Sequence, residues 1–278
     1  MTPLTYLAIV TAILVLAVCV AVLCQRALLR KLTTELKSSS VGTSSVDLSL
    51  LSALPVPVQR YFRFALTDGQ PIIRQVSFLQ SGQLKADVTS SSWMPFNARH
   101  IATSMPAGFL WNADIRVLPC LSINVIDSVL HGIGLSRASI YSAITMATSK
   151  NLPQLNEAAL HRYLAEAVWY PTSLLPQCGV SWTAIDDNCA LATLIDSGLT
   201  VSLLFHFNNE GAVTSVSTPA RYRLVRGGFQ PTPWEGHFSQ YALHDGMQIP
   251  MYGEVGWYDS HRLVLVWKGT ITQIKFRY

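Results

Sequence analysis

The stretch RYLAEAVWYPTSLLP, residues 162–176, decides how the rest of the chain can fold. It continues a helical pattern in which apolar residues recur at positions i, i+3, i+4, i+7 and i+8. These residues are Leu160, Tyr163, Leu164, Ala167 and Val168. Asn156 is a suitable N-cap for this helix, and Pro171 ends or kinks it. The sequence therefore predicts one long helix in the middle of the chain.

On both sides of this helix the apolar and polar residues alternate with a period of two, which is typical of strands. Before it, a hairpin turning at Ser81-Gly82 is followed by predicted strands at 97–104, 109–118, 121–130 and 135–144. After it, strands are predicted at 180–186, 190–196, 200–207, 212–218, 221–225, 237–243, 248–258 and 263–276, with Asp186-Asp187-Asn188 as one of the turns.

A flat open sheet of about twelve strands is unfavourable, because wide twisted sheets curl or close. We therefore predict an α+β fold that is mainly antiparallel β. Its expected form is a curved open half-barrel of about twelve strands wrapped on the one inserted long helix. A short helix with Pro57 in its first turn is expected before the sheet.

The N-terminal segment has the length and composition of a membrane span. Residues 1–25 carry no charged side chain, and residues 4–24 are almost wholly aliphatic. At about 1.5 Å per residue such a stretch spans roughly 30 Å, the thickness of a bilayer core. A cleaved signal peptide normally has a basic start and a shorter apolar core, so we predict a transmembrane helix. A lipoprotein box ending at Cys19 is the weaker alternative.

The charges next to this span predict its orientation. Arg26, Arg30, Lys31 and Lys37 follow the span, and no charged side chain precedes it. The positive-inside rule then predicts a single-pass inner-membrane protein with its C-terminal domain in the cytoplasm. We expect residues 26–49 to form a basic juxtamembrane segment, helical at the membrane surface over 28–36, and a Ser-rich linker. Residues 50–278 are expected to form a single domain.

Composition argues against several functional classes. The net charge of +4 is modest and the positive residues form no run, so no nucleic-acid partner is predicted. Cys120, Cys178 and Cys189 lack metal-ligand spacing and are expected as small buried side chains, so no metal is predicted. The sequence has no Gly-rich phosphate loop, His-Glu-x-x-His helix or Gly-x-Ser-x-Gly elbow, and no cofactor is predicted. We therefore expect binding more than catalysis.

Seven stretches together resemble a family of bacterial conserved proteins of unknown function, many of which carry an N-terminal membrane segment. They are LPVPVQRYFRFAL (54–66), WMPF (93–96), GFLWNADI (108–115), RYLAEAVWYPTSLLP (162–176), AIDD (184–187), PARYR (219–223) and PTPWEGHF (231–238). The resemblance covers nearly all of residues 50–278. The order of its elements is also similar to the lipoprotein-carrier (LolA/LolB-like) fold, an open half-barrel that holds helices against an apolar concave face. This second resemblance implies a shape and no chemistry.

The candidate ligand-binding residues lie on the helix and on two strands. On the helix, the i, i+4 pair of Arg162 and Glu166 either joins on the surface or directs Glu166 into the concave space. Arg221 shares a strand face with Arg223, and Glu235 shares one with His237. The full set is Arg162, Glu166, Trp169, Tyr170, Arg221, Tyr222, Trp234, Glu235 and His237.

Three functional hypotheses follow from these residues. The leading one is a membrane-anchored module that holds an apolar or lipid-like ligand between sheet and helix, because amphipathic aromatic residues suit the wall of such a cavity. An alternative is an enzyme of unassigned class, which requires Glu166, Glu235, His237 and Arg221 to meet in the cavity. The third is a scaffold for a partner protein.

Overall fold

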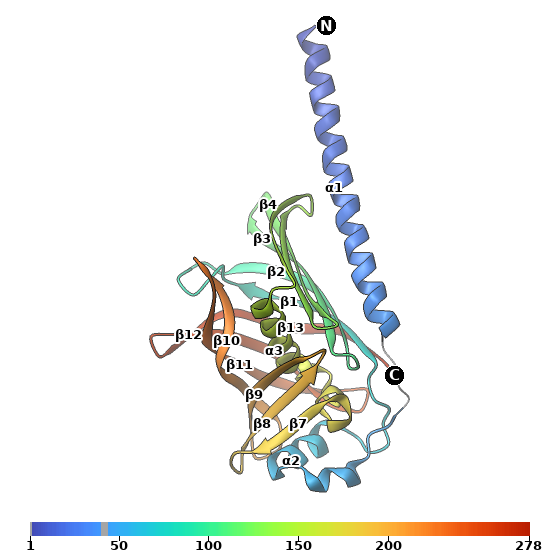
Figure 1. Ribbon diagram of the computed structural model, residues 1–278, viewed down its shortest axis with the longest axis vertical. Coiled ribbons are helices and arrows are strands. Elements are labelled where there is room, and N and C mark those ends of the chain that lie inside the picture. The colour runs from blue at the N-terminus through green and yellow to red at the C-terminus, as the bar shows by residue number, and fades with distance from the viewer. Residues whose placement is uncertain (1, 40–43) are drawn as a thin grey trace.

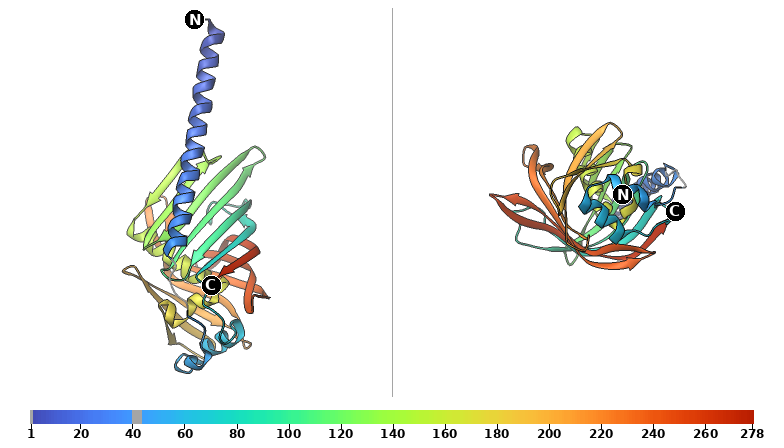
Figure 2. Two further views of the ribbon diagram at one scale, coloured as in Figure 1. Left: turned by 90° about the vertical axis from the view of Figure 1, so that its right-hand side faces the viewer. Right: turned by 90° about the horizontal axis from the view of Figure 1, so that it is seen from below.

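The computed structural model describes residues 2–39 and 44–278, and its strands form one antiparallel sheet (Figure 1). The strand order is β6-β5-β4-β3-β2-β1-β13-β12-β11-β10-β9-β8-β7, so two meanders meet where β1 pairs with β13. The sheet does not close, because β6 and β7 remain its two edges. It curves around the inserted helix α3 (Pro153–Glu166), as the two further views show (Figure 2). The predicted open half-barrel is confirmed.

The first meander precedes α3 and the second follows it. The first consists of β1 (Gln75–Leu84), β2 (Met94–Thr103), β3 (Gly108–Leu118), β4 (Leu121–Leu130), β5 (Ile133–Ile140) and β6 (Ile144–Lys150). The second consists of β7 (Val180–Ala184), β8 (Cys189–Asp196), β9 (Leu199–Phe207), β10 (Val213–Val225), β11 (Gly228–His244), β12 (Met247–Asp259) and β13 (Arg262–Arg277).

The pairing of β1 with β13 overturns the predicted hairpin at Ser81-Gly82. Both residues lie inside the continuous strand β1, and Gly82 pairs with Gly269 of β13. A Cβ atom on Gly82 would overlap the carbonyl oxygen of Lys268, so this glycine permits a close backbone approach. A glycine in an alternating segment can mark either a turn or a close backbone approach within a strand, and only the partner strand distinguishes the two.

Other element boundaries also differ from the predicted ones. Helix α3 begins at Pro153, where the missing N–H costs nothing, and not after Asn156. The Asn156 side chain instead accepts a hydrogen bond from the Gly134 N–H. The predicted strand 135–144 is the end of β5 and the start of β6, and the two predicted strands at 212–225 form the single bulged strand β10.

Several short helices and α3 fill the concave face of the sheet. They are α2 (Val56–Ala65) and the 3-10 helices η1 (Leu48–Ala53), η2 (Ala167–Trp169), η3 (Pro171–Leu174) and η4 (Pro176–Cys178). Tyr61, Tyr163 and Tyr170 are among the largest fully buried side chains of this core. Cys178 and Cys189 are buried as expected, whereas Cys120 is exposed at the turn between β3 and β4.

Helix α1 (Pro3–Ser39) is the one helix of the described residues that is long and apolar enough to cross a membrane. It continues past residue 25 without a break, and its second half packs on the outer face of the sheet. That contact is made by Leu28, Leu29, Leu32 and Leu36 against Ile101, Leu110, Ile126, Leu130 and Leu135. The predicted membrane-surface helix 28–36 therefore covers the sheet instead. Residues 40–43 of the predicted Ser-rich linker lie outside the described residues.

The close approach at Gly82 generates a stability prediction. We expect Gly82→Val to lower the free energy of unfolding by roughly 3 kcal/mol or more, because the new side chain collides with the β13 backbone. Ser81→Val is the matched control, since Ser81 is exposed on the same strand. The measurement is urea unfolding of the full chain in a mild detergent. Equal stability of the two variants would show that β13 has room for a side chain at this point.

Candidate functional site

A cavity of about 410 Å³ lies between α3 and the concave face of the sheet. This volume is within the range of small-molecule sites, roughly 300–1,000 Å³. Five of the seven tryptophans of the chain line it, namely Trp111, Trp169, Trp234, Trp257 and Trp267. The concave face is therefore not completely filled by side chains.

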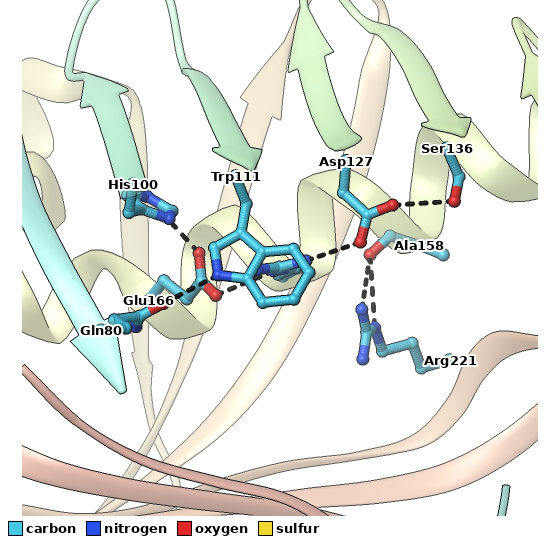
Figure 3. A network of polar contacts seen from close by, with 9 residues as sticks. Gln80, His100, Trp111, Asp127, Ser136, Ala158, Glu166 and Arg221 are labelled. Carbon is cyan, nitrogen blue, oxygen red and sulfur yellow. Dashed lines mark hydrogen bonds and ion pairs between the residues drawn. The ribbon is translucent and has the colours of Figure 1, made fainter. Parts of the chain in front are cut away.

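Arg162 crosses from α3 to the sheet at the wall of this cavity. Its Nε donates to Glu166 Oε1 at 2.8 Å, and one terminal nitrogen donates to Asp127 Oδ2 at 3.0 Å. The other oxygen of Asp127 accepts from the Ser136 hydroxyl at 2.7 Å (Figure 3). The guanidinium also lies over the rings of two aromatic residues, with 4.9 Å to the centroid of Phe109 and 4.8 Å to that of Trp111. The i, i+4 pair forms, but it lies at the cavity wall and not on the exposed surface of the helix.

Burial and charge act in opposite directions on this pair. Burial lowers the pKa of Arg162, but the carboxylates of Glu166 and Asp127 outweigh that effect and raise it. Burial raises the pKa of Glu166, and the nearby Arg162 reduces the rise. The free Oε2 of Glu166 has no hydrogen-bond partner among the described residues. Glu166 therefore keeps one buried oxygen without a hydrogen bond.

His100 lies next to that oxygen and was not among the predicted site residues. Its Nε2 is 3.7 Å from Glu166 Oε2 (Figure 3). Its ring stacks on Phe78, with 4.6 Å between centroids. Burial, together with the charge of Arg162, holds the His100 pKa well below its usual value. The imidazole is therefore neutral at physiological pH, and its contact with Glu166 is not an ion pair. The sequence does contain a signal for His100, because it is a polar residue on the apolar face of β2, in line with Phe96, Ala98 and Ala102.

Arg221 enters the cavity from β10, opposite α3. It lies over Trp234, 5.0 Å from the ring centroid, and over Trp257 at 5.3 Å. Its guanidinium donates to the Ala158 carbonyl oxygen at 3.2 and 3.3 Å (Figure 3). No carboxylate of the described residues forms an ion pair with it. Burial and the nearby Arg162 lower its pKa to about 10, so it stays charged at neutral pH.

Trp169 supplies a second unsatisfied polar atom from the end of the helical segment. Its ring lines the cavity and packs edge-on against Phe78 and Phe238. The indole Nε1 is buried and has no hydrogen-bond partner among the described residues. Five of the nine predicted residues thus line the cavity: Arg162, Glu166, Trp169, Arg221 and Trp234.

The other four predicted residues do not line the cavity. Tyr170 is buried behind α3, where its hydroxyl donates to the Tyr163 carbonyl oxygen. Tyr222 alternates with Arg221 and Arg223, both of which line the cavity, and so faces the other side of β10.

Glu235 and His237 lie on the outer face of β11, because Trp234 and Phe238 occupy its inner face. There His237 Nε2 is 2.7 Å from Glu235 Oε1, and the Tyr258 hydroxyl donates to Glu235 Oε2 at 2.6 Å. The set of Glu166, Arg221, Glu235 and His237 is therefore divided between two faces. These four residues therefore do not meet in the cavity, as catalysis by this set would require. No group of three or more His, Cys, Asp and Glu residues in the described ranges is placed to hold a metal.

The chain belongs to a family of unknown function, DUF6920, whose profile matches residues 52–276. This confirms the predicted membership of an uncharacterised family. No curated protein matches the sequence.

Two solved structures are similar to the chain at low identity. One is a LolA superfamily protein from Nitrosomonas europaea, with 9% identity and a TM-score of 0.36, over 81% of this chain and 95% of that chain. The other is a β-barrel-like protein of unknown function (DUF1849) from Brucella abortus, with 9% identity and a TM-score of 0.25, over 74% of this chain and 99% of that chain.

The charge network at Arg162 predicts a characteristic mutational pattern. Arg162→Met leaves the carboxylates of Glu166 and Asp127 without their cation, so we expect the free energy of unfolding to fall by about 3 kcal/mol. Adding Glu166→Gln to that variant removes one uncompensated charge and should recover part of the loss. Urea unfolding at neutral pH measures both changes. A double variant less stable than Arg162→Met would contradict the assignment of Glu166 as the charge that Arg162 neutralises.

Proposed function

We propose that the domain binds an amphipathic ligand with an apolar body and one anionic group. The observation that supports this best is Arg221, which carries a positive charge into a tryptophan-lined cavity and has no carboxylate partner. A partly buried cation without a directly bonded carboxylate is unfavourable for folding alone. An anionic ligand group beside Arg221 would supply the missing charge.

The other walls of the cavity fit the same kind of ligand. The tryptophan rings offer large flat apolar surfaces for the body of the ligand. Glu166 and Asp127 are already bound to Arg162, so they place negative charge on the α3 side of the cavity. A ligand with a single anionic end would therefore orient that end toward β10.

The same proposal assigns α1 as the membrane anchor. Residues 4–24 are its apolar part, and the basic residues that follow support a cytoplasmic position for the domain by the positive-inside rule. The proposed division is a span at 1–25, a connecting segment at 26–49 whose helical part packs on the sheet, and a binding domain at 50–278. A module with this arrangement would hold an apolar compound close to the membrane in which that compound dissolves.

A matched pair of ligands tests the role of Arg221. Dodecanoic acid and dodecanol have the same alkyl chain and differ in charge. Native mass spectrometry of the detergent-purified full-length protein measures the fraction of protein that retains each ligand. We expect Arg221→Met to weaken retention of dodecanoic acid by about tenfold, since a hydrogen bond to a charged group contributes about 1.5–3 kcal/mol. Retention of dodecanol should be unchanged.

Arg226→Met is the control, because Arg226 is an exposed arginine in the turn after the same strand. It should leave the retention of both ligands unchanged. Equal retention of dodecanoic acid by the wild type and Arg221→Met would contradict an anion site at Arg221. Retention of neither ligand by the wild type would contradict the binding function itself.

A further inference from the structure

Two hairpins of the first meander expose apolar side chains at their tips. The β3–β4 turn exposes 59% of Leu118, and Pro119 and Cys120 beside it are also exposed. The turn between β5 and β6 and the start of β6 expose 55% of Tyr141, 61% of Ile144 and 56% of Met146. Clustered exposed apolar residues of this kind are typical of surfaces that contact a protein or a membrane.

Both tips point toward the N-terminal end of α1 (Figures 1 and 2). The position is fixed by Gln25, whose side-chain nitrogen donates to Asn124 Oδ1 at 2.6 Å and whose oxygen accepts from the Ser139 hydroxyl at 3.0 Å. Asn124 and Ser139 are cross-strand partners on β4 and β5. Each lies a few residues from its own hairpin turn, so α1 passes beside both tips shortly before Gln25.

The exposure of α1 to solvent changes where the helix passes the two hairpin tips. Residues 2–20 are exposed throughout, whereas Ala21 and Val22 are partly covered and Gln25 is buried. The exposed helical residues 3–20 extend about 27 Å at 1.5 Å per residue, which is close to the thickness of a bilayer core. If these residues cross a bilayer, its surface lies at the two hairpin tips.

The side chains near this level suit a membrane interface. Tyrosine is enriched at the headgroup level of bilayers, and Tyr141 lies at a tip. Arg26 and Arg116 are exposed just below it, on α1 and near the end of β3, where they can reach anionic headgroups. The apolar tip residues would then lie among the first carbons of the acyl chains.

We infer that the tips of the β3–β4 and β5–β6 hairpins insert into the leaflet that α1 enters, and that the half-barrel is held against the bilayer at three points. This inference rests on the proposal that α1 crosses the membrane. The partner is the lipid bilayer itself. Gln25 keeps the helix and the two hairpins in register, so the orientation of the domain relative to the bilayer is fixed.

This orientation gives the cavity an apolar connection to the membrane. Ile123 pairs with Ile115 on one side and Ile140 on the other, and Ile140 pairs with Ile144. Cross-strand partners share a face of the sheet. Ile115 lines the cavity and Ile144 is exposed at the tip, so the row leads from the proposed ligand site to the bilayer surface.

Cysteines already present in the chain allow a direct test. Cys19 lies in the exposed part of α1, Cys120 lies at a hairpin tip, and Cys178 and Cys189 are buried. Three full-length variants each carry one exposed cysteine, which is Cys19, Cys120 or a new Glu210→Cys. The other exposed cysteines are replaced in each variant. Glu210 is exposed in the turn between β9 and β10, away from the tips. Each is labelled with a nitrobenzoxadiazole fluorophore and reconstituted in phosphatidylcholine–phosphatidylglycerol vesicles that contain spin-labelled lipid.

We expect lipid quenching of the probes at positions 19 and 120, several-fold stronger than at position 210. Adding Ile144→Asp and Met146→Asp to the Cys120 variant should reduce the quenching of its probe. Adding the same two substitutions to the Cys19 variant should leave the quenching of its probe unchanged. Quenching at 19 with none at 120 would overturn the hairpin insertion and leave the membrane anchor intact. Absence of quenching at 19 would overturn the anchor and the insertion together.

Discussion

The pairing of β1 with β13 is the constraint on which the rest of the fold depends. It joins the two meanders across almost the whole length of the domain sequence, and it requires glycine at position 82, where a Cβ atom would overlap the β13 backbone. Such a non-local contact forms only after a long loop has closed, so its entropic cost must be offset by the apolar surface that the joined sheet buries. Without it, each meander would be a separate sheet and α3 would cover neither completely.

Because the joined sheet stays open, its concave face has to be filled from within the chain. The helical segment from α3 to η4 supplies most of that filling, with Tyr163 and Tyr170 fully buried. The filling is incomplete on the side where Trp169 and Arg162 meet the sheet. There the wall consists of aromatic rings and guanidinium groups, which pack face to face without satisfying all of their polar atoms. Two buried polar atoms at this wall, Glu166 Oε2 and Trp169 Nε1, have no hydrogen-bond partner among the described residues.

Helix α1 combines two surfaces in one continuous element. Its first part is apolar on all sides and exposed, whereas its second part directs leucines to the sheet and basic residues to solvent. Gln25 marks the change, since an amide in that position is satisfied by Asn124 and Ser139 and would be unsatisfied in hydrocarbon. Because α1 is one continuous helix, the packing of its second part on the sheet fixes the direction in which its apolar first part extends.

The sequence alone determined the features that depend on local pattern. Periodicity located β3 and β4 to within a residue and placed a helix between two strand-rich halves, and the i, i+4 spacing joined Arg162 with Glu166. Only the tertiary structure decided which faces meet. It set Glu235 and His237 on the outer face, brought Asp127 and His100 to the helix, and made Gly82 a point of close approach and not a turn. The physical reason is that a period of two fixes which residues share a face, but the partner strand and the curvature of the sheet decide which face is concave.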